Sequence, residues 1–279
     1  MQIEAVLLRT LGLTAGPPPM LSRFATVVVA LAHVDEDLIW QAPSVVEGDR
    51  DVVTGIAVYE RNILPMLKYF AGTLRLSGYS GEIILGVSPS ISEGERRYLR
   101  SINCTHYAVK AISCGEAASI HSDSTRIRGA CSAKYPRLKL EWARYQLAKD
   151  WIEACPHCTG WALVSDVRDA AFFGHPFREL GNPDTTANDL LLIEEYAGKD
   201  RGLHNDNWFS WAGIYKCYGF TDGKKIVDRY RSMPVLNSGT TIGTRSGIIR
   251  YLRTIVKQFQ EMVDMGRHCQ PPSVPGGCR

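Results

Sequence analysis

Two acidic residues that follow an apolar run in the middle of the chain are candidates for holding a metal ion. Trp161-Ala162-Leu163-Val164 has the composition of a buried strand, and Asp166 and Asp169 come directly after it. Ligands of open α/β sheets bind beyond the carboxyl ends of the strands, and carboxylates there suit Mg²⁺ or Mn²⁺ held together with substrate phosphates. We therefore predict a metal site at Asp166 and Asp169, with Arg168 either pairing with a phosphate or pointing outward. The alternative is that Asp166 caps a turn and Asp169 is solvated.

Polar and aromatic residues elsewhere in the chain are candidates for binding a substrate. Asn237 either bonds hydroxyls of a ligand or is a turn residue before a strand, and Gly239 lets the backbone approach a ligand closely. Arg144, on the helix predicted before the metal strand, either reaches a phosphate group or lies on a solvated helix face. Trp208 and Trp211 form either a stacking surface for a substrate ring or part of the core.

The segment Cys155-Pro156-His157-Cys158 matches the C-x-x-C pattern of thiol oxidoreductases. In those proteins the motif follows a strand and opens a helix, whose N-terminus lowers the pKa of the thiol. Here the order is reversed, because a predicted helix precedes the motif and a predicted strand follows it. A thiol oxidoreductase using Cys155 and Cys158 is therefore a minor alternative, and a structural disulfide or two free thiols is the plainer interpretation.

The elements that must position these residues alternate between strands and helices. Short apolar runs predict strands at 52–59, 83–87, 107–109, 161–164, 190–193 and 235–243. Helical spacing or capping signals predict helices at 63–78, 92–102, 138–154 and 246–265. Such alternation is typical of βαβ units with a mostly parallel sheet. The stretch from Cys114 to Ala133, rich in Ser, Gly and Ala, is expected to be a loop, and the Trp-rich stretch from Asn205 to Gly219 is assigned no element.

Composition and charge limit the function classes that fit. The 279 residues are 45% hydrophobic and 22% charged, as in a globular protein, and the net charge of +3 is too small to argue for a nucleic-acid partner. No run approaches the roughly 18 apolar residues that span a bilayer, so no transmembrane segment is predicted. Residues 1–50, broken by Pro17-Pro18-Pro19, are interpreted as an N-terminal extension. Eight cysteines and the sequon Asn103-Cys104-Thr105 favour the secretory pathway, in the ER or Golgi lumen.

Two segments resemble signatures of the GT-A-fold glycosyltransferases, the nucleotide-diphospho-sugar transferase superfamily. Leu163 to Phe177 resembles their strand, D-x-R-D, aromatic pair and x-x-P-F sequence. Val235 to Gly243 resembles their later N-[SA]-G-x-x-x-G strand, and Val53 to Val87 resembles their first βαβ unit, which binds the nucleotide base. The resemblance covers about residues 51 to 278 and rests on the order and separation of these motifs.

The resemblance implies a single GT-A-like domain over residues 51–279, an α/β fold with a mostly parallel central sheet flanked by helices. It implies transfer of a hexose from a nucleoside diphosphate sugar to a hydroxyl of a glycan, protein or small acceptor, with Mn²⁺ or Mg²⁺ at Asp166 and Asp169. Asn237, Ser238 and Gly239 would line the sugar site, and this strand favours the retaining families. No nucleophile or base is implied.

The sequence departs from the family pattern at two places. The usual acidic motif is D-x-D, whereas here Arg168 takes the third place, which leaves open which carboxylate touches the metal. Related enzymes commonly continue with a D-Q pair and a late His that contacts metal or diphosphate, and neither occurs before Arg279. A truncated domain, or a degenerate and non-catalytic one that binds sugar or a partner, is therefore the alternative.

Overall fold

The computed structural model describes six ranges of the chain, residues 50–58, 62–113, 130–168, 170–194, 209–230 and 236–264. The predicted extension up to residue 49 lies outside these ranges, and so do Asp169 and Trp208. Trp211 lies in a helix, but its side chain is outside the description.

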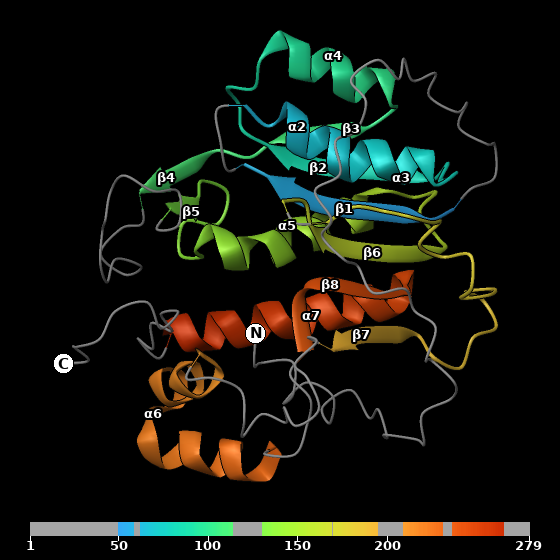
Figure 1. The fold of residues 1–279 in the computed structure, drawn as a ribbon. Helices are drawn as coiled ribbons and strands as arrows, with labels where there is room; N and C mark the ends of the chain where they lie inside the picture. Colours follow the sequence, from blue (N-terminus) through green and yellow to red (C-terminus); the bar gives the residue numbers. More distant parts are fainter. Residues whose placement is uncertain are drawn as a thin grey trace.

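A six-stranded sheet in the order β3-β2-β1-β6-β8-β7 forms the centre of the molecule (Figure 1). Neighbours from β3 to β6 are parallel, whereas β8 runs antiparallel to both β6 and β7. The mostly parallel α/β fold predicted from the sequence is therefore confirmed. The strands are β1 (Val52–Ala57), β2 (Glu82–Val87), β3 (Thr105–Ala108), β6 (Trp161–Asp166), β7 (Leu190–Glu194) and β8 (Leu236–Thr244).

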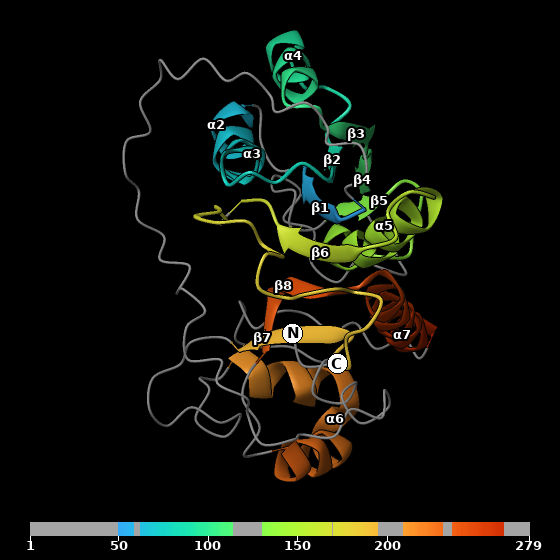
Figure 2. The ribbon, with the colours of Figure 1, turned by 90° about the vertical axis from the view of Figure 1, so that its right-hand side faces the viewer.

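Helices cover both faces of this sheet (Figure 2). One face packs against α2, η1, α3 and α4, and the other packs against α5 and α7. Successive residues of the central strands point to opposite faces, so Val52 and Ile56 join one core while Val53 and Ala57 join the other. The helical elements are α2 (Leu64–Leu67), the π-helical turn η1 (Lys68–Gly72), α3 (Thr73–Leu76), α4 (Glu93–Ser101), α5 (Leu140–Ala154), α6 (Phe209–Tyr230) and α7 (Arg245–Asp264).

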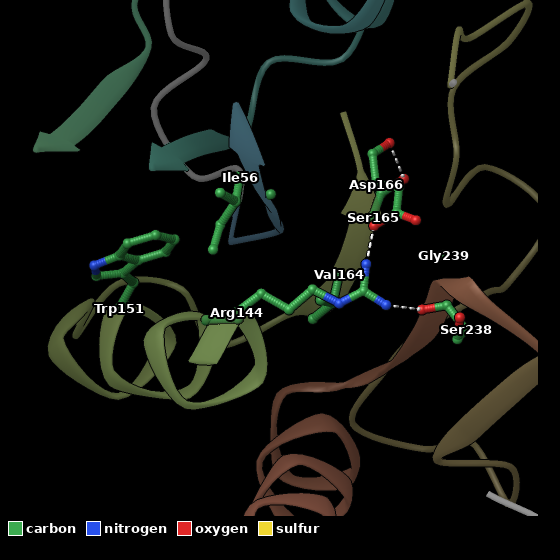
Figure 3. Close-up of a pocket in the computed structure, with 10 residues that line it drawn as sticks. Ile56, Arg144, Trp151, Val164, Ser165, Asp166, Ser238 and Gly239 are labelled. Atoms are coloured by element: carbon green, nitrogen blue, oxygen red, sulfur yellow. Dashed lines mark hydrogen bonds and ion pairs between the residues drawn. The ribbon is translucent and has the colours of Figure 1, made fainter. Parts of the chain in front are cut away.

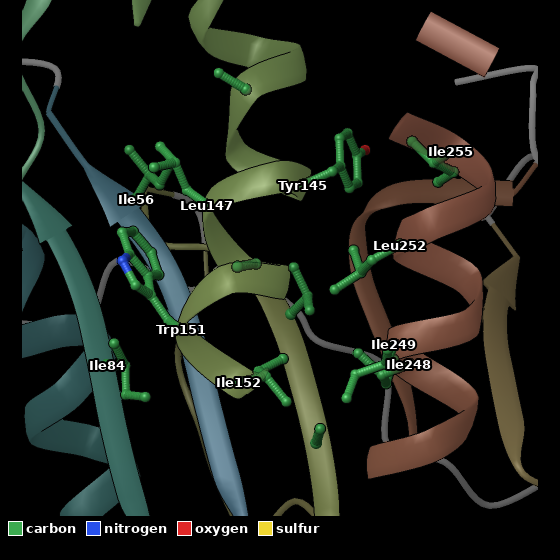
Figure 4. Packing of buried hydrophobic residues seen from close by; sticks show 14 of the residues in the cluster. Ile56, Ile84, Tyr145, Leu147, Trp151, Ile152, Ile248, Ile249, Leu252 and Ile255 are labelled. Carbon is green, nitrogen blue, oxygen red and sulfur yellow. The ribbon is translucent and has the colours of Figure 1, made fainter. Parts of the chain in front are cut away.

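The packing of α5 on α7 fixes the helix that carries Arg144. Tyr145 on α5 faces Leu252 and Ile255 on α7 (Figure 4). Further along the same interface, the rings of Trp142 and Phe259 stack with centroids 4.8 Å apart and planes within 2°. Burial of these apolar side chains holds α5 against α7, and at the end of α5 Arg253 on α7 adds an ion pair with Glu153 at 2.7 Å.

Three local features differ from the sequence prediction. The helix predicted at 63–78 is interrupted by η1, and it begins with Pro65 in its first turn, where proline is tolerated. The end of the expected loop is a strand, because β5 (Ala130–Ser132) pairs antiparallel with β4 (Ala111–Ser113). Residues 114–129 of that loop lie outside the described ranges.

The third difference is α6, which the sequence did not predict. It has a small cluster of its own around Ile214, Val227 and Tyr230, and Tyr218 packs against both this cluster and the large core that contains α5 and α7. Gly219 has φ 75°, a conformation that favours glycine, so α6 consists of two helical pieces joined at a kink. No helix in the described part of the chain is both long enough and apolar enough to cross a membrane.

Candidate functional site

Asp166 lies at the carboxyl edge of the parallel strands, as its place in the sequence predicted. It is the last residue of β6 and pairs with Ile56, near the end of β1. Ser165, just before it, pairs with Thr240 in the middle of β8. The antiparallel direction of β8 therefore brings the Asn-Ser-Gly segment to the same edge of the sheet, which is where ligands of α/β proteins bind.

Arg144 joins these two segments (Figure 3). Its Nη1 donates to Asp166 Oδ1, and its Nη2 donates to the backbone carbonyl of Ser238 at 3.0 Å. The guanidinium also lies over the ring of Tyr145, 4.7 Å from the centroid, while Tyr145 Oη donates to the same Ser238 carbonyl at 3.2 Å. The Arg144 side chain is 17% exposed and that of Asp166 is 43% exposed. A charged side chain on α5 is thus held in one orientation beside a carboxylate that solvent still reaches.

Gly239 fits against the other oxygen of the same carboxylate. A Cβ atom at this position would lie 2.8 Å from Asp166 Oδ2 and 3.1 Å from Asn237 Oδ1. The Asn237 amide oxygen accepts a hydrogen bond from the Gly239 N–H at 2.7 Å, so this oxygen helps to hold the backbone of Gly239 in place. Glycine thus lets the backbone pass this carboxylate closely without displacing it.

These residues line a hollow between α5 and the strand ends (Figure 3). Its lining adds residues that the sequence did not single out, in particular Trp151 on α5 and Gly55 on β1. A Cβ at Gly55 would meet Val167 Cγ2 at 2.5 Å and Ser165 O at 2.6 Å, so the glycine allows β1 and β6 to approach each other closely at this point. The full lining is Gly55, Ile56, Arg144, Ala148, Trp151, Val164, Ser165, Asp166, Ser238 and Gly239.

The structure brings some of the predicted residues together and leaves others apart. Asp166, Arg144, Ser238 and Gly239 line the hollow, and Asn237 orients Gly239 beside it. Arg168 is exposed, two residues past the strand end. Asp169 and Trp208 fall outside the described residues, as does the side chain of Trp211, and their predicted roles stay predictions.

The charges of the hollow suit an anion and a hard cation together. Arg144 offers a planar guanidinium of the kind that binds phosphate oxygens in pairs. Asp166 is the one carboxylate among the described residues of its lining. The side chain of Asp166 is 43% exposed, so its carboxylate is accessible to a small ligand. One carboxylate plus substrate phosphates is a common way of holding Mg²⁺ or Mn²⁺.

The C-x-x-C segment lies at the opposite end of β6, where a disulfide joins Cys155 and Cys158. The motif connects the end of α5 to the start of β6, and Cys131 is also disulfide-bonded. The plainer interpretation of the motif, a structural disulfide, agrees with this geometry.

Comparisons with known proteins give similarities in structure. No protein-family model matches the sequence, and no curated protein matches it. The chain is similar to a solved structure of an active-site mutant of LgtC, at 16% identity over 79% of this chain and 66% of that one, with a TM-score of 0.42. The galactosyltransferase LgtC with donor and acceptor sugar analogues gives 16% identity over 78% and 66%, with the same TM-score.

A third similar structure is core-mannan synthase A from Aspergillus fumigatus in a manganese and GDP form. The identity is 11% over 75% of this chain and 65% of that one, with a TM-score of 0.38. The chain thus spans just under two thirds of the length of these solved chains. Those solved proteins are a galactosyltransferase and a core-mannan synthase.

Proposed function

We propose that this chain is a metal-dependent glycosyltransferase that moves a sugar from a nucleoside diphosphate sugar to a hydroxyl acceptor. The observation that carries the proposal is the pairing of Arg144 with Asp166 over the backbone of Ser238 and Gly239. A guanidinium, a half-exposed carboxylate and a closely approaching backbone meet at the carboxyl edge of a parallel sheet. This combination suits a diphosphate joined to a polar sugar.

Each residue has a proposed role. Arg144 binds the diphosphate oxygens, with Arg168 as a second cation, and Asp166 with Asp169 holds Mn²⁺ or Mg²⁺. The metal, when bound, neutralises charge that develops on the diphosphate leaving group. Asn237, Ser238 and Gly239 would line the sugar, and Trp208 and Trp211 are proposed to form a stacking surface for the acceptor.

The proposed reaction exchanges one bond at the anomeric carbon for another. The bond from that carbon to the diphosphate oxygen breaks, the acceptor oxygen forms a new bond to it, and the acceptor hydroxyl loses its proton. Retention of configuration is proposed from the resemblance of the Asn-Ser-Gly strand to the retaining families. The acceptor is a glycan, protein or small molecule.

A donor screen tests the enzymatic proposal. The protein with Mn²⁺ is incubated with a panel of nucleotide sugars, and nucleotide release is measured. We expect release from at least one donor, its loss when the metal is chelated, and a drop of about 100-fold or more in Asp166→Asn, since loss of one transition-state contact costs roughly 10²–10³. Asp222→Asn, at an exposed ion pair with Lys225 on α6, is the matched control and should keep full activity. A folded protein that releases nucleotide from no donor would contradict the proposal.

One contact favours the second candidate, a non-catalytic domain that binds sugar or a partner. Arg144 already neutralises one oxygen of Asp166, which reduces the carboxylate's attraction for a metal ion. Calorimetry with the same donor panel separates the two candidates. Metal-independent binding of a nucleotide sugar without turnover would support the binding domain, and metal-dependent binding with turnover would support the enzyme.

A place in the secretory pathway, in the ER or Golgi lumen, is proposed from the cysteines. The Cys155–Cys158 disulfide and the disulfide-bonded Cys131 support it, because disulfides persist in oxidising compartments. Fractionation of cells expressing a tagged full-length protein tests it, and recovery in a cytosolic fraction with reduced thiols would contradict it.

A further inference from the structure

A second cluster with ligand chemistry lies away from the Asp166 hollow. Cys155, His157 and Cys158 offer ligand atoms that all lie within 4.8 Å of one another. Glu82, the first residue of β2, adds a carboxylate, with its Oε2 3.5 Å from His157 Nε2. β6 begins just after this cluster and ends at Asp166, about 17 Å further at the usual rise per residue. None of the four residues lines the hollow.

We propose that reduction of the Cys155–Cys158 disulfide converts this cluster into a tetrahedral Zn²⁺ site. The ligands are the two thiolates, His157 Nε2 and Glu82 Oε2. A dithiol or a phosphine supplies the two electrons that break the S–S bond, and the two sulfurs take up two protons as thiols. Zinc binding then releases those protons, because thiolates rather than thiols bind the metal.

Two of the donor-to-donor distances already fit such a site. Zinc bond lengths of about 2.3 Å to sulfur and about 2.0 Å to nitrogen or oxygen give tetrahedral edges of roughly 3.6 Å for S···N and 3.3 Å for N···O. The structure has 3.4 Å between Cys155 Sγ and His157 Nε2, and 3.5 Å between His157 Nε2 and Glu82 Oε2. The sulfurs of Cys155 and Cys158, which are bonded to each other, have to separate for both to bind the ion.

The surroundings supply an outer shell and an entry path. Thr105 on β3 donates from its hydroxyl to Glu82 Oε1 at 2.5 Å, which leaves Oε2 directed toward the imidazole. Outer contacts of this kind orient metal ligands. Cys155 and Cys158 are buried, whereas the side chain of His157 is 64% exposed, so an ion can arrive from the side of the imidazole.

The disulfide and the zinc site exclude each other, because both use the same two sulfurs. The ambient balance between thiols and disulfides therefore selects the state. In an oxidising lumen the disulfide holds the end of α5 against β6, and in a reducing compartment zinc takes over the same connection. This inference does not depend on glycosyltransferase activity.

Cobalt titration of the full chain tests it, because Co²⁺ takes the same tetrahedral ligands as zinc and is coloured. The protein is reduced with a phosphine under nitrogen, and Co²⁺ and then Zn²⁺ are added. We expect a thiolate-to-cobalt charge-transfer band and tetrahedral d–d bands that saturate at one ion per chain and disappear on zinc addition. His157→Ala and Glu82→Gln should each weaken binding by at least about 10–100-fold, the range found when even an outer-shell partner is lost.

Matched variants separate this site from other thiols and imidazoles. The double variant Cys155→Ser with Cys158→Ser keeps all other cysteines, including Cys131, and should lose the bands. Cys104→Ala, at a buried free thiol, and His106→Ala, on β3, should keep them.

Circular dichroism follows the fold in every sample. Bands that persist in the double variant, or affinities unchanged in both His157→Ala and Glu82→Gln, would overturn the proposal. So would a reduced wild type that shows no bands, whether it stays folded or unfolds without recovery on zinc addition.

Discussion

The Arg144 guanidinium satisfies a carboxylate, a backbone carbonyl and an aromatic face at the same time. An ion pair with a partner as exposed as Asp166 contributes little to stability, typically 0–1 kcal/mol. The small contribution to stability is consistent with the proposal that Arg144 is held in place to bind a ligand. Because the guanidinium is held before any ligand arrives, less side-chain freedom is lost on binding.

At the residue scale, Gly239→Ala should impair ligand binding and leave the fold intact. The added methyl group would meet Asp166 Oδ2, the far end of a side chain that can turn away, so the carboxylate shifts rather than the strand. We expect donor affinity in the presence of Mn²⁺ to fall about tenfold, or about 1.4 kcal/mol, by calorimetry. Gly174→Ala is the control, since a Cβ there meets nothing within 4 Å. Equal affinities for the two variants would contradict the role of Gly239.

At the scale of elements, the start of α4 depends on Glu95. This side chain is 3% exposed, and its two carboxylate oxygens accept from the N–H groups of Ile63 at 2.7 Å and Ser92 at 2.6 Å. Burial alone would raise the pKa of the Glu95 carboxyl, but the hydrogen bonds from Ser92 and Ile63 hold it below its usual value. The capping box of α4 thus also fixes the start of α2.

Glu95→Gln should destabilise the protein by about 1–3 kcal/mol at neutral pH, because one of the two buried N–H groups loses its acceptor. The pKa is lower in the folded state, so the ionised form stabilises the fold above the unfolded pKa of about 4.3, and this contribution disappears as pH falls through the folded pKa. Urea unfolding at several pH values should show the difference between wild type and variant shrinking below about pH 4.3. Glu93→Gln, at an exposed position in the same turn, should change stability little at any of them. A difference independent of pH would contradict this account.

Replacement of Gly247 and of Gly94 by alanine should change the stability of the protein in opposite directions. A Cβ at Gly247, near the start of α7, would lie 1.9 Å from the backbone oxygen of Asp189, so β7 and α7 would have to move apart. We expect Gly247→Ala to cost about 1–3 kcal/mol or more. Gly94→Ala, in α4 with Ser92 Oγ at 3.8 Å as the nearest atom, should stabilise by roughly 0.5–1 kcal/mol. Thermal unfolding of both variants checks the two signs.

The sequence predicts elements well where a local pattern sets them. Every strand of the large sheet begins or ends within a few residues of an apolar run. The signal is clearest for β1, β2 and β6, which are almost wholly buried, as the inner strands of parallel sheets are. The apolar pattern does not predict α6, because the kink at Gly219 interrupts its helical period. It also fails for β4 and β5, which are three residues each and too short to show a period.

The candidate site is also predictable from the sequence only where a local pattern sets the position of a residue. Asp166 follows a strand, so its edge position can be inferred locally. The contact of Arg144 with both Asp166 and Ser238 joins segments far apart in the chain and depends on how α5 packs. Trp151 and Gly55 line the hollow through packing alone, and nothing in their neighbours in the sequence announces it.

At the scale of the whole molecule, two cores on opposite faces of the sheet stabilise the domain. The ring of Phe259 on α7 stacks on Trp142 and lies 5.7 Å from the ring of Tyr145, which supports Arg144 and the Ser238 carbonyl. The packing of α7 on α5 therefore helps to hold Tyr145, and through it the residues that line the hollow.

Phe259→Ala should lower the free energy of unfolding by about 3–5 kcal/mol, as other large-to-small changes of buried aromatic residues do. It should also weaken donor binding, because Tyr145 loses a neighbour. Chemical denaturation and calorimetry measure the two effects. Lys257→Ala, on the exposed side of the same helix, should stay within about 0.5 kcal/mol of wild type. A full loss of stability in Phe259→Ala with unchanged donor affinity would show that the two are not connected.

The reversed direction of β8 has a consequence for how this molecule can diversify. Because Ser165 near the end of β6 pairs with Thr240 in the middle of β8, the residues just after Asp166 and those from Asn237 to Gly239 meet at one rim of the six-stranded sheet. Two stretches that are remote in the gene can therefore alter that rim independently, while the strands that carry them keep their pairing.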